Sequence, residues 1–125
     1  MSSATCVLVI DDEPDIREIA KISLQITKKW DVLTAASGLE GLDLAISSQP
    51  DLILLDVAMP DMDGFATLKQ LLSNPATAKI PVLLLTATAK VVQETEYLQF
   101  GAQGVLLKPF DPGVLGDQIE LALTP

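Results

Sequence analysis

Five short runs of apolar residues are spaced along the chain, and longer stretches that mix apolar and polar residues separate them. The runs are Cys6–Ile10, Val32–Ala36, Leu52–Leu55, Val82–Leu85 and Val105–Leu107. Four of the five contain no polar residue, which is typical of strands covered on both faces of a sheet. We therefore predict five strands in the interior of the domain.

The stretches between these runs carry the signals of helices. The first follows Asp11-Asp12-Glu13 and places Pro14 in its first turn, where proline is favoured. Apolar positions at helical spacing predict its buried face. They are Ile16, Ile19, Ala20 and Leu24, and Thr27 extends the stripe. Four further helices are predicted at Gly38–Ser48, Gly64–Ser73, Ala89–Phe100 and Asp111–Leu123, the last containing two glycines that lower its helix propensity.

Regular alternation of strands and helices indicates a parallel sheet with right-handed crossovers, and hence a three-layer α/β domain. The chain has 125 residues, of which 49% are hydrophobic and 20% charged. This length suits one domain with a core of its own. We predict that residues 1–125 form a single domain.

Composition excludes several kinds of function. The chain has no histidine, which excludes histidine general bases and histidine metal ligands. The single Cys6 excludes an internal disulfide and fits a reducing cytoplasm. A net charge of −9 argues against binding to nucleic acid backbones. No apolar run approaches the roughly 20 residues that span a bilayer, and no signal peptide is visible, so we expect a cytoplasmic protein.

Polar residues stand at the ends of four predicted strands. They are Asp11-Asp12-Glu13, Asp56, Thr86 and Lys108-Pro109. Strand ends of a parallel sheet meet at one edge, so we expect these side chains to converge. Clustered carboxylates repel one another unless a cation intervenes, and Mg²⁺ prefers such oxygen ligands. Lys108 and Thr86 suit a phosphate, and the central Asp56 could form an acyl phosphate as the nucleophile.

Each of these residues also has a simpler interpretation. The acidic triplet could do no more than cap the following helix, and Asp56 could be a turn residue ahead of Met59-Pro60. Thr86 could likewise cap a helix, and Lys108 could be a solvated side chain. Their shared position at the strand ends is what favours a functional site.

Four segments together resemble the receiver domain of bacterial two-component response regulators. The segments are Val7–Pro14, Leu52–Gly64, Leu84–Ala87 and Leu107–Phe110. They occur in the order and at the spacing of that family, and the resemblance extends from Val7 to about Leu123. It implies a flavodoxin-like fold with strand order 2-1-3-4-5 and five helices.

The resemblance also implies a function and a site. Asp56 would accept a phosphoryl group from the phosphohistidine of a sensor kinase or phosphotransfer protein. Asp12 would bind Mg²⁺ directly, Asp11 through water, and the backbone carbonyl of Ala58 would complete the protein ligands. Thr86 and Lys108 would contact the bound phosphoryl group, and the Lys108-Pro109 bond would be cis. The domain would catalyse only its own phosphorylation and dephosphorylation, signal to a downstream protein, and neither bind nucleic acid nor insert into a membrane.

Three alternatives remain to be weighed. A phosphatase of the haloacid dehalogenase type needs a second aspartate two positions after its nucleophile, where this chain has Ala58. A flavodoxin-like electron carrier needs a hydroxyl-rich phosphate loop and flanking aromatic residues, but aromatic residues make up only 4% of the chain. A module of the same fold that binds its partner constitutively would need none of the acceptor-site residues, all of which are present.

Three further features bear on how a signal would leave the domain. Ile22 and Ile26 widen the apolar arc of the first predicted helix beside Ile19, as either a docking surface or the rim of the core. Val91 and Val92 are adjacent, so one of them could belong to an output surface. Many receivers carry an aromatic residue three positions before the active-site lysine, where this chain has the β-branched Val105. We therefore expect the Thr86–Lys90 loop to respond to phosphorylation more than Val105 does.

Overall fold

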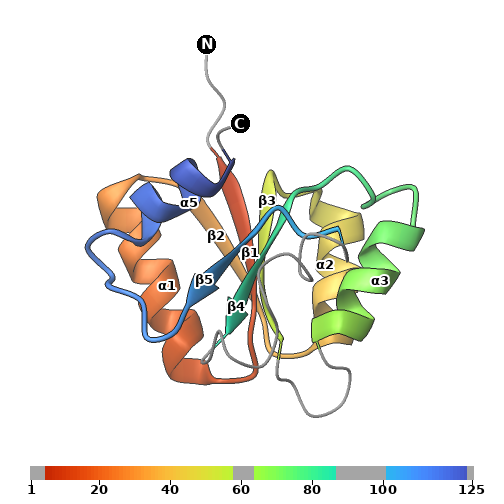
Figure 1. The fold of residues 1–125 in the computed structure, drawn as a ribbon, viewed down its shortest axis with the longest axis horizontal. Helices are drawn as coiled ribbons and strands as arrows, with labels where there is room; N and C mark the ends of the chain where they lie inside the picture. Colours follow the sequence, from red (N-terminus) through yellow and green to blue (C-terminus); the bar gives the residue numbers. More distant parts are fainter. Residues whose placement is uncertain (1–4, 58–63, 87–100, 124–125) are drawn as a thin grey trace.

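The computed structural model describes residues 5–57, 64–86 and 101–123, which contain five strands and four helices (Figure 1). The strands are β1 (Cys6–Ile10), β2 (Asp31–Ala35), β3 (Leu52–Asp56), β4 (Val82–Thr86) and β5 (Gly104–Leu107). The helices are α1 (Pro14–Thr27), α2 (Gly38–Ser48), α3 (Gly64–Ser73) and α5 (Leu115–Leu123). None of the described helices is long and apolar enough to cross a membrane.

The five strands form one parallel sheet in the order β2-β1-β3-β4-β5. Helices α1 and α5 cover one face of the sheet, and α2 and α3 cover the other (Figure 1). This arrangement confirms the predicted three-layer, flavodoxin-like fold. Its consequence for function is that the ends of β1, β3, β4 and β5 share one edge, which is called the carboxyl edge below.

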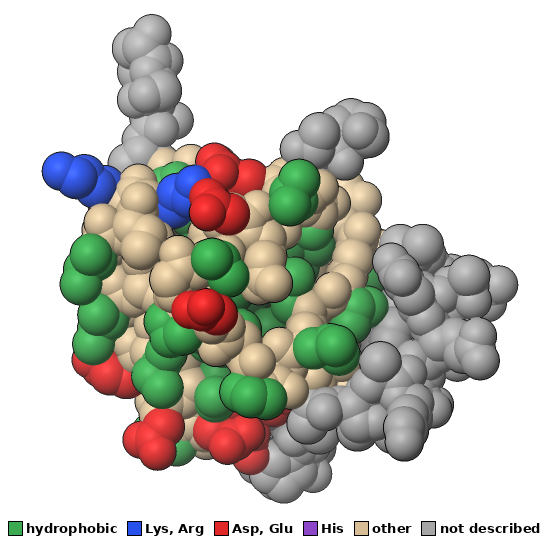
Figure 2. Space-filling model, turned by 60° about the vertical axis from the view of Figure 1, so that its left-hand side comes forward, with side chains coloured by type: hydrophobic (Ala, Val, Ile, Leu, Met, Phe, Trp, Pro, Cys, Tyr) green, Lys and Arg blue, Asp and Glu red, His purple; other side chains and the backbone are tan. Residues whose placement is uncertain are grey.

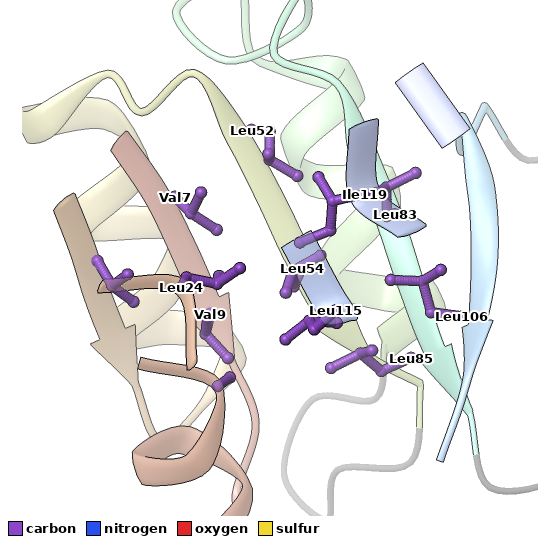
Figure 3. Packing of buried hydrophobic residues seen from close by; sticks show 12 residues of the cluster. Val7, Val9, Leu24, Leu52, Leu54, Leu83, Leu85, Leu106, Leu115 and Ile119 are labelled. Carbon is purple, nitrogen blue, oxygen red and sulfur yellow. The ribbon is translucent and has the colours of Figure 1, made fainter. Parts of the chain in front are cut away.

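Successive side chains of the central strands point to opposite faces of the sheet and so belong to two separate hydrophobic clusters. In β1, Val7 and Val9 face α1 and α5, whereas Leu8 and Ile10 face α2 and α3. Figure 3 shows the first cluster, in which Leu24 of α1 and Ile119 of α5 pack onto the same sheet face. Because side chains from both faces of β1 are fully buried, the strand needs apolar residues at every position, as its sequence shows.

Helix α2 begins where the sequence supplies a cap. The side chain of Ser37 accepts a hydrogen bond from the backbone N–H of Glu40, at 3.2 Å. The carboxylate of Glu40 in turn accepts from the backbone N–H of Ala36, at 2.7 Å. The first bond satisfies a backbone donor that the first helical turn leaves without an intrahelical partner, and the second joins the helix to the residue before its cap. Together they fix the path from β2 into α2.

Two expectations about helices were wrong. The last helix begins at Leu115 and not at Asp111, because Asp111, Pro112 and Gly113 form a turn in which the Asp111 carboxylate accepts from the Gly113 N–H at 2.8 Å. Helix α1 does not bury Ile19, which is 41% exposed, and Thr27 is exposed as well.

Helix α1 buries Ala20 and Leu24 as predicted, and it also buries Ser23. The buried Ser23 hydroxyl donates to the carbonyl of Pro112, which explains a polar residue in this position. The predicted helix Ala89–Phe100 and its residues Val91 and Val92 lie outside the described residues.

Candidate functional site

Four strands bring the predicted residues to the carboxyl edge. Asp11 directly follows β1, Asp56 ends β3, Thr86 ends β4 and Lys108 follows β5. The register aligns these ends, because Asp56 pairs with Leu85 across β3 and β4. Convergence of these strand ends was predicted from the sequence, and it follows from the parallel sheet alone.

Asp11 is fully buried, and the surrounding backbone holds it in place. Its N–H donates to the carbonyl of Ala35 at 3.0 Å, and its Oδ1 accepts from the N–H of Glu13 at 2.9 Å. The guanidinium of Arg17 donates to the Asp11 carbonyl at 2.7 Å. The loop between β1 and α1 is therefore fixed at both the backbone and the side chain.

Three carboxylates meet at this edge. Asp11, Asp12 and Asp56 each offer an oxygen atom, and these oxygens all lie within 4.8 Å of one another. The Oδ2 atom of Asp11 is buried and accepts no hydrogen bond of regular geometry, although the Lys108 ammonium lies 2.8 Å away. A buried carboxylate oxygen in this state, beside two further carboxylates, fits a hard divalent cation such as Mg²⁺.

Lys108 is the cation of the site. Its Nζ lies 2.8 Å from Asp11 Oδ2, 3.3 Å from Asp56 Oδ1 and 3.3 Å from Glu13 Oε1. Burial acts to lower the pKa of Lys108, but the close contact with the Asp11 carboxylate, the charges of Asp11 and Asp56, and the hydrogen bond to Glu13 together outweigh it and raise the pKa. The ammonium is therefore fully charged at neutral pH. Among the described residues of this edge, the four carboxylates of Asp11, Asp12, Glu13 and Asp56 outnumber the two cationic groups, which belong to Lys108 and Arg17.

Thr86 and Lys108 are tied to each other through the backbone. The N–H of Lys108 donates to the carbonyl of Thr86 at 2.8 Å, and Thr86 is only 4% exposed. The Lys108-Pro109 peptide bond is cis, as the family resemblance implied. Both residues are therefore held at the strand ends beside Asp56, where the sequence predicted them.

Gly64 fixes the other side of the site. A Cβ atom at this position would lie 2.3 Å from the Cα of Val57 and 2.4 Å from the carbonyl oxygen of Asp56. Only glycine allows the first turn of α3 to approach the end of β3 so closely. The N–H of Gly64 donates to the carbonyl of Val57 at 3.2 Å and joins the two segments.

Sequence reasoning placed Glu13 at this edge but did not predict its contact with Lys108, and it missed Arg17. Glu13 pairs with Lys108, and Arg17 holds the Asp11 carbonyl. A signal for Arg17 was present, because a cation in the second turn of α1 can reach back to the loop that precedes the helix. The backbone carbonyl of Ala58, a predicted metal ligand, lies outside the described residues, as do residues 87–90 of the predicted responsive loop.

The face of α1 beyond the carboxyl edge carries the predicted apolar arc. Ile19, Ile22 and Ile26 are 41%, 46% and 72% exposed. With Pro112 and Gly113 they line an open groove of about 330 Å³. Figure 2 brings this side of the molecule forward and shows hydrophobic side chains spread between acidic ones.

Val105 is a partly buried residue of β5 and packs against the α2 and α3 side of the core. On the neighbouring strand β4, Val105 pairs with Leu84. A short aliphatic side chain in this position packs in the core and has no polar tip to expose. The structure thus gives Val105 an ordinary role in the sheet.

Similarity to known proteins agrees with this geometry. The family model described as "Response regulator receiver domain" matches residues 7–120. The chain is 41% identical over 105 residues to the Synechocystis protein "DNA-binding dual master transcriptional regulator RpaA", covering 84% of this chain and 43% of that protein. It is 35% identical over 117 residues to the alkaline phosphatase synthesis regulator PhoP of Bacillus subtilis, covering 94% of this chain and 46% of PhoP.

Structural similarity covers nearly the whole fold. The Vibrio cholerae chemotaxis protein CheY4 superimposes with a TM-score of 0.88 at 34% identity, covering 97% of this chain and 100% of CheY4. The curated relatives are longer, and the chain spans less than half of RpaA and of PhoP. The match over residues 7–120, the strand order and the acidic carboxyl edge together show that this chain belongs to the response-regulator receiver domain family.

Proposed function

We propose that this chain acts as a single receiver domain that switches a signal when Asp56 accepts a phosphoryl group. The observation that carries the proposal is the position of Asp56, which is 3% exposed at the end of β3 and 3.3 Å from the Lys108 ammonium. The donor would be the phosphohistidine of a sensor histidine kinase or a phosphotransfer protein. Receiver domains generally act as switches of this kind and not as enzymes with an external substrate.

The proposed transfer needs positioning and charge neutralisation more than it needs a base. A carboxylate oxygen of Asp56 attacks phosphorus, a P–O bond forms, and the P–N bond to the donor imidazole breaks with its electron pair returning to the ring nitrogen. Asp56 is ready for this attack because β3 fixes its backbone and Lys108 holds one of its oxygens. The product is an acyl phosphate, which agrees with the absence of histidine in this chain.

Receiver domains bind Mg²⁺ at an acidic aspartate cluster, and this chain has such a cluster. We propose that Asp11, Asp12 and Asp56 hold the ion together with the carbonyl of Ala58. Bound Mg²⁺ supplies positive charge to the carboxylates and to the transferred phosphoryl oxygens. Lys108 and the Thr86 hydroxyl are proposed to bind the remaining phosphoryl oxygens.

The proposed output is contact with a downstream protein. The name of RpaA describes that longer protein as DNA-binding. This chain carries a net charge of −9, which disfavours contact with phosphate backbones, so we assign no nucleic acid contact to the receiver residues themselves. The proposal places the domain in the cytoplasm, and the single Cys6 fits a reducing compartment.

The proposal is tested by incubating the protein with Mg²⁺ and acetyl phosphate and weighing it intact. We expect the wild type to gain the mass of one phosphoryl group and Asp56→Asn to gain none. Asp43→Asn is the matched control, because Asp43 is an exposed aspartate on α2, and it should be labelled like the wild type. Equal labelling of Asp56→Asn, or an unlabelled wild type, would refute the proposal.

A further inference from the structure

One ammonium group at the carboxyl edge is shared by three carboxylates that differ in their surroundings. Asp11 and Asp56, which contact Lys108 at 2.8 and 3.3 Å, have side chains that are 0% and 4% exposed. Glu13 contacts the same Nζ at 3.3 Å, but its side chain is 61% exposed. Glu13 is therefore the partner that can leave Lys108 without losing its access to water.

The backbone around Glu13 leaves its carboxylate available for this contact. Glu13 is the N-cap residue of α1, yet its side chain makes no capping hydrogen bond. Its own N–H is already bonded to Asp11 Oδ1 at 2.9 Å. Instead of capping the helix, the carboxylate accepts a hydrogen bond from the ammonium of Lys108, 95 positions later in the chain.

We propose that Glu13 is a positioning residue that competes with the phosphoryl group on Asp56 for the Lys108 ammonium. This inference rests on the proposed phosphorylation of Asp56. A phosphoryl group adds about −1.5 to −2 of charge and three acceptor oxygens beside Lys108. To hold those oxygens, Lys108 gives up its contact with Glu13, whose charge also repels the phosphoryl group. Glu13 thus sets how strongly the switch favours its phosphorylated state.

The same charge acts in the opposite direction on a cation. Glu13 is one of four carboxylates that the described residues bring to this edge, so it attracts Mg²⁺ even though it lies outside the group of three metal-ligand candidates. Removal of that charge should weaken Mg²⁺ binding and strengthen binding of a phosphoryl-like anion. Damage to the local structure would weaken both.

The test compares wild type, Glu13→Gln and Glu18→Gln, an exposed charge on the same helix. Mg²⁺ affinity is measured by calorimetry on the metal-free protein, and beryllofluoride affinity is measured at saturating Mg²⁺. For Glu13→Gln we expect beryllofluoride to bind about two- to fivefold more tightly and Mg²⁺ about two- to fivefold more weakly, the range for an exposed charge pair. Glu18→Gln should change both affinities less than Glu13→Gln does. Both differences should shrink in about 1 M salt, where the screening length is roughly 3 Å.

Two results would overturn the inference. One is a Glu13→Gln variant that binds both Mg²⁺ and beryllofluoride more weakly, because that pattern indicates a structural role. The other is a variant that cannot be distinguished from Glu18→Gln. Failure of the proposed function looks different, because wild type would then bind no beryllofluoride at Asp56, as shown by equal binding to Asp56→Asn.

Discussion

Two lysines hold carboxylates at opposite edges of the sheet. Lys28 follows α1, near the edge of the sheet where the strands begin, and contacts Asp117 and Glu120 of α5 at 2.7 and 2.6 Å. Lys108, at the carboxyl edge, contacts Asp11 and Asp56 at 2.8 and 3.3 Å, and both of these side chains are buried. The partners of Lys28 are instead 63% and 55% exposed.

The difference separates a structural contact from a site that can bind a ligand. Water solvates the carboxylates that Lys28 contacts, so that cluster needs no further cation. At the carboxyl edge, water is excluded from two carboxylates and the charge is not balanced. A surplus of buried negative charge around a single ammonium is what attracts a divalent ion and then a phosphoryl group.

The largest effect is expected when Lys108 is replaced by methionine, and the same replacement of Lys28 is the control. Lys108→Met should reduce beryllofluoride affinity at saturating Mg²⁺ by about tenfold or more, because charge-assisted hydrogen bonds to the anion are lost. Lys28→Met should leave that affinity within about twofold of the wild type. The measurement is a beryllofluoride titration followed by NMR. Full retention of the wild-type shift pattern by Lys108→Met would show that Lys108 does not bind the phosphoryl mimic.

A second prediction concerns the metal group. Asp12→Ala should weaken Mg²⁺ binding by about tenfold or more and slow phosphorylation of Asp56, because one of three clustered carboxylates is lost. Asp15→Ala, an exposed carboxylate in the first turn of α1, is the control and should have a small effect. Calorimetric titration with Mg²⁺ measures both variants. An unchanged Mg²⁺ titration for Asp12→Ala would contradict the assignment of this residue.

Glycines at the two edges offer a third comparison, now of stability. In Gly64→Ala the new Cβ meets backbone atoms at 2.3 and 2.4 Å, which cannot move aside as a flexible side chain can. We expect the free energy of unfolding to fall by about 1–3 kcal/mol, as for other overpacked positions. In Gly104→Ala, at the start of β5, the nearest atoms lie at 3.4 and 3.5 Å, so the change should be smaller. Urea denaturation measures the free energy of unfolding of both variants. If Gly104→Ala lowers it as much as Gly64→Ala does, the close approach of Gly64 to the end of β3 is not what makes Gly64→Ala unstable.

The smallest effect is expected for the stability of Lys28→Met. Hydrogen bonds to Asp117 and then to Glu120 raise the pKa of Lys28 above its usual value of 10.5. The pairing therefore stabilises the fold fully below pH 10.5 and is lost as the pH rises through the raised value. The difference in melting temperature between wild type and Lys28→Met should be constant near neutral pH and should shrink in high salt. A difference that grows with salt would show that the contact is not electrostatic.

Local signals in the sequence were enough to predict most of the fold. The bounds of α2 and α3, Gly38–Ser48 and Gly64–Ser73, were predicted correctly because the spacing of apolar residues is a signal that acts within a few residues. Tertiary contacts decided the rest. Ile19 has the correct spacing for a core position, but Ser23 is buried against Pro112, in the turn before α5, and Ile19 stays exposed.

The candidate site was predictable in its members and not in its detailed contacts. Strand ends of a parallel sheet must meet, so Asp11, Asp56 and Lys108 could be grouped from the sequence. The choice of partners within that group depends on side-chain geometry. The acidic triplet suggested a helix cap for Glu13, yet its carboxylate contacts Lys108, 95 positions away in the chain, so no local signal could have assigned it.

Reduction of the phosphorylated protein with borohydride tests the central claim most directly. An acyl phosphate is reduced to an alcohol, so a phosphorylated aspartate becomes homoserine, which peptide mass spectrometry locates. After treatment with Mg²⁺ and acetyl phosphate, we predict homoserine at position 56 in the wild type and at no position in Asp56→Asn. Homoserine at position 11 or 12 instead, or its absence from a protein that gained the phosphoryl mass, would contradict the account.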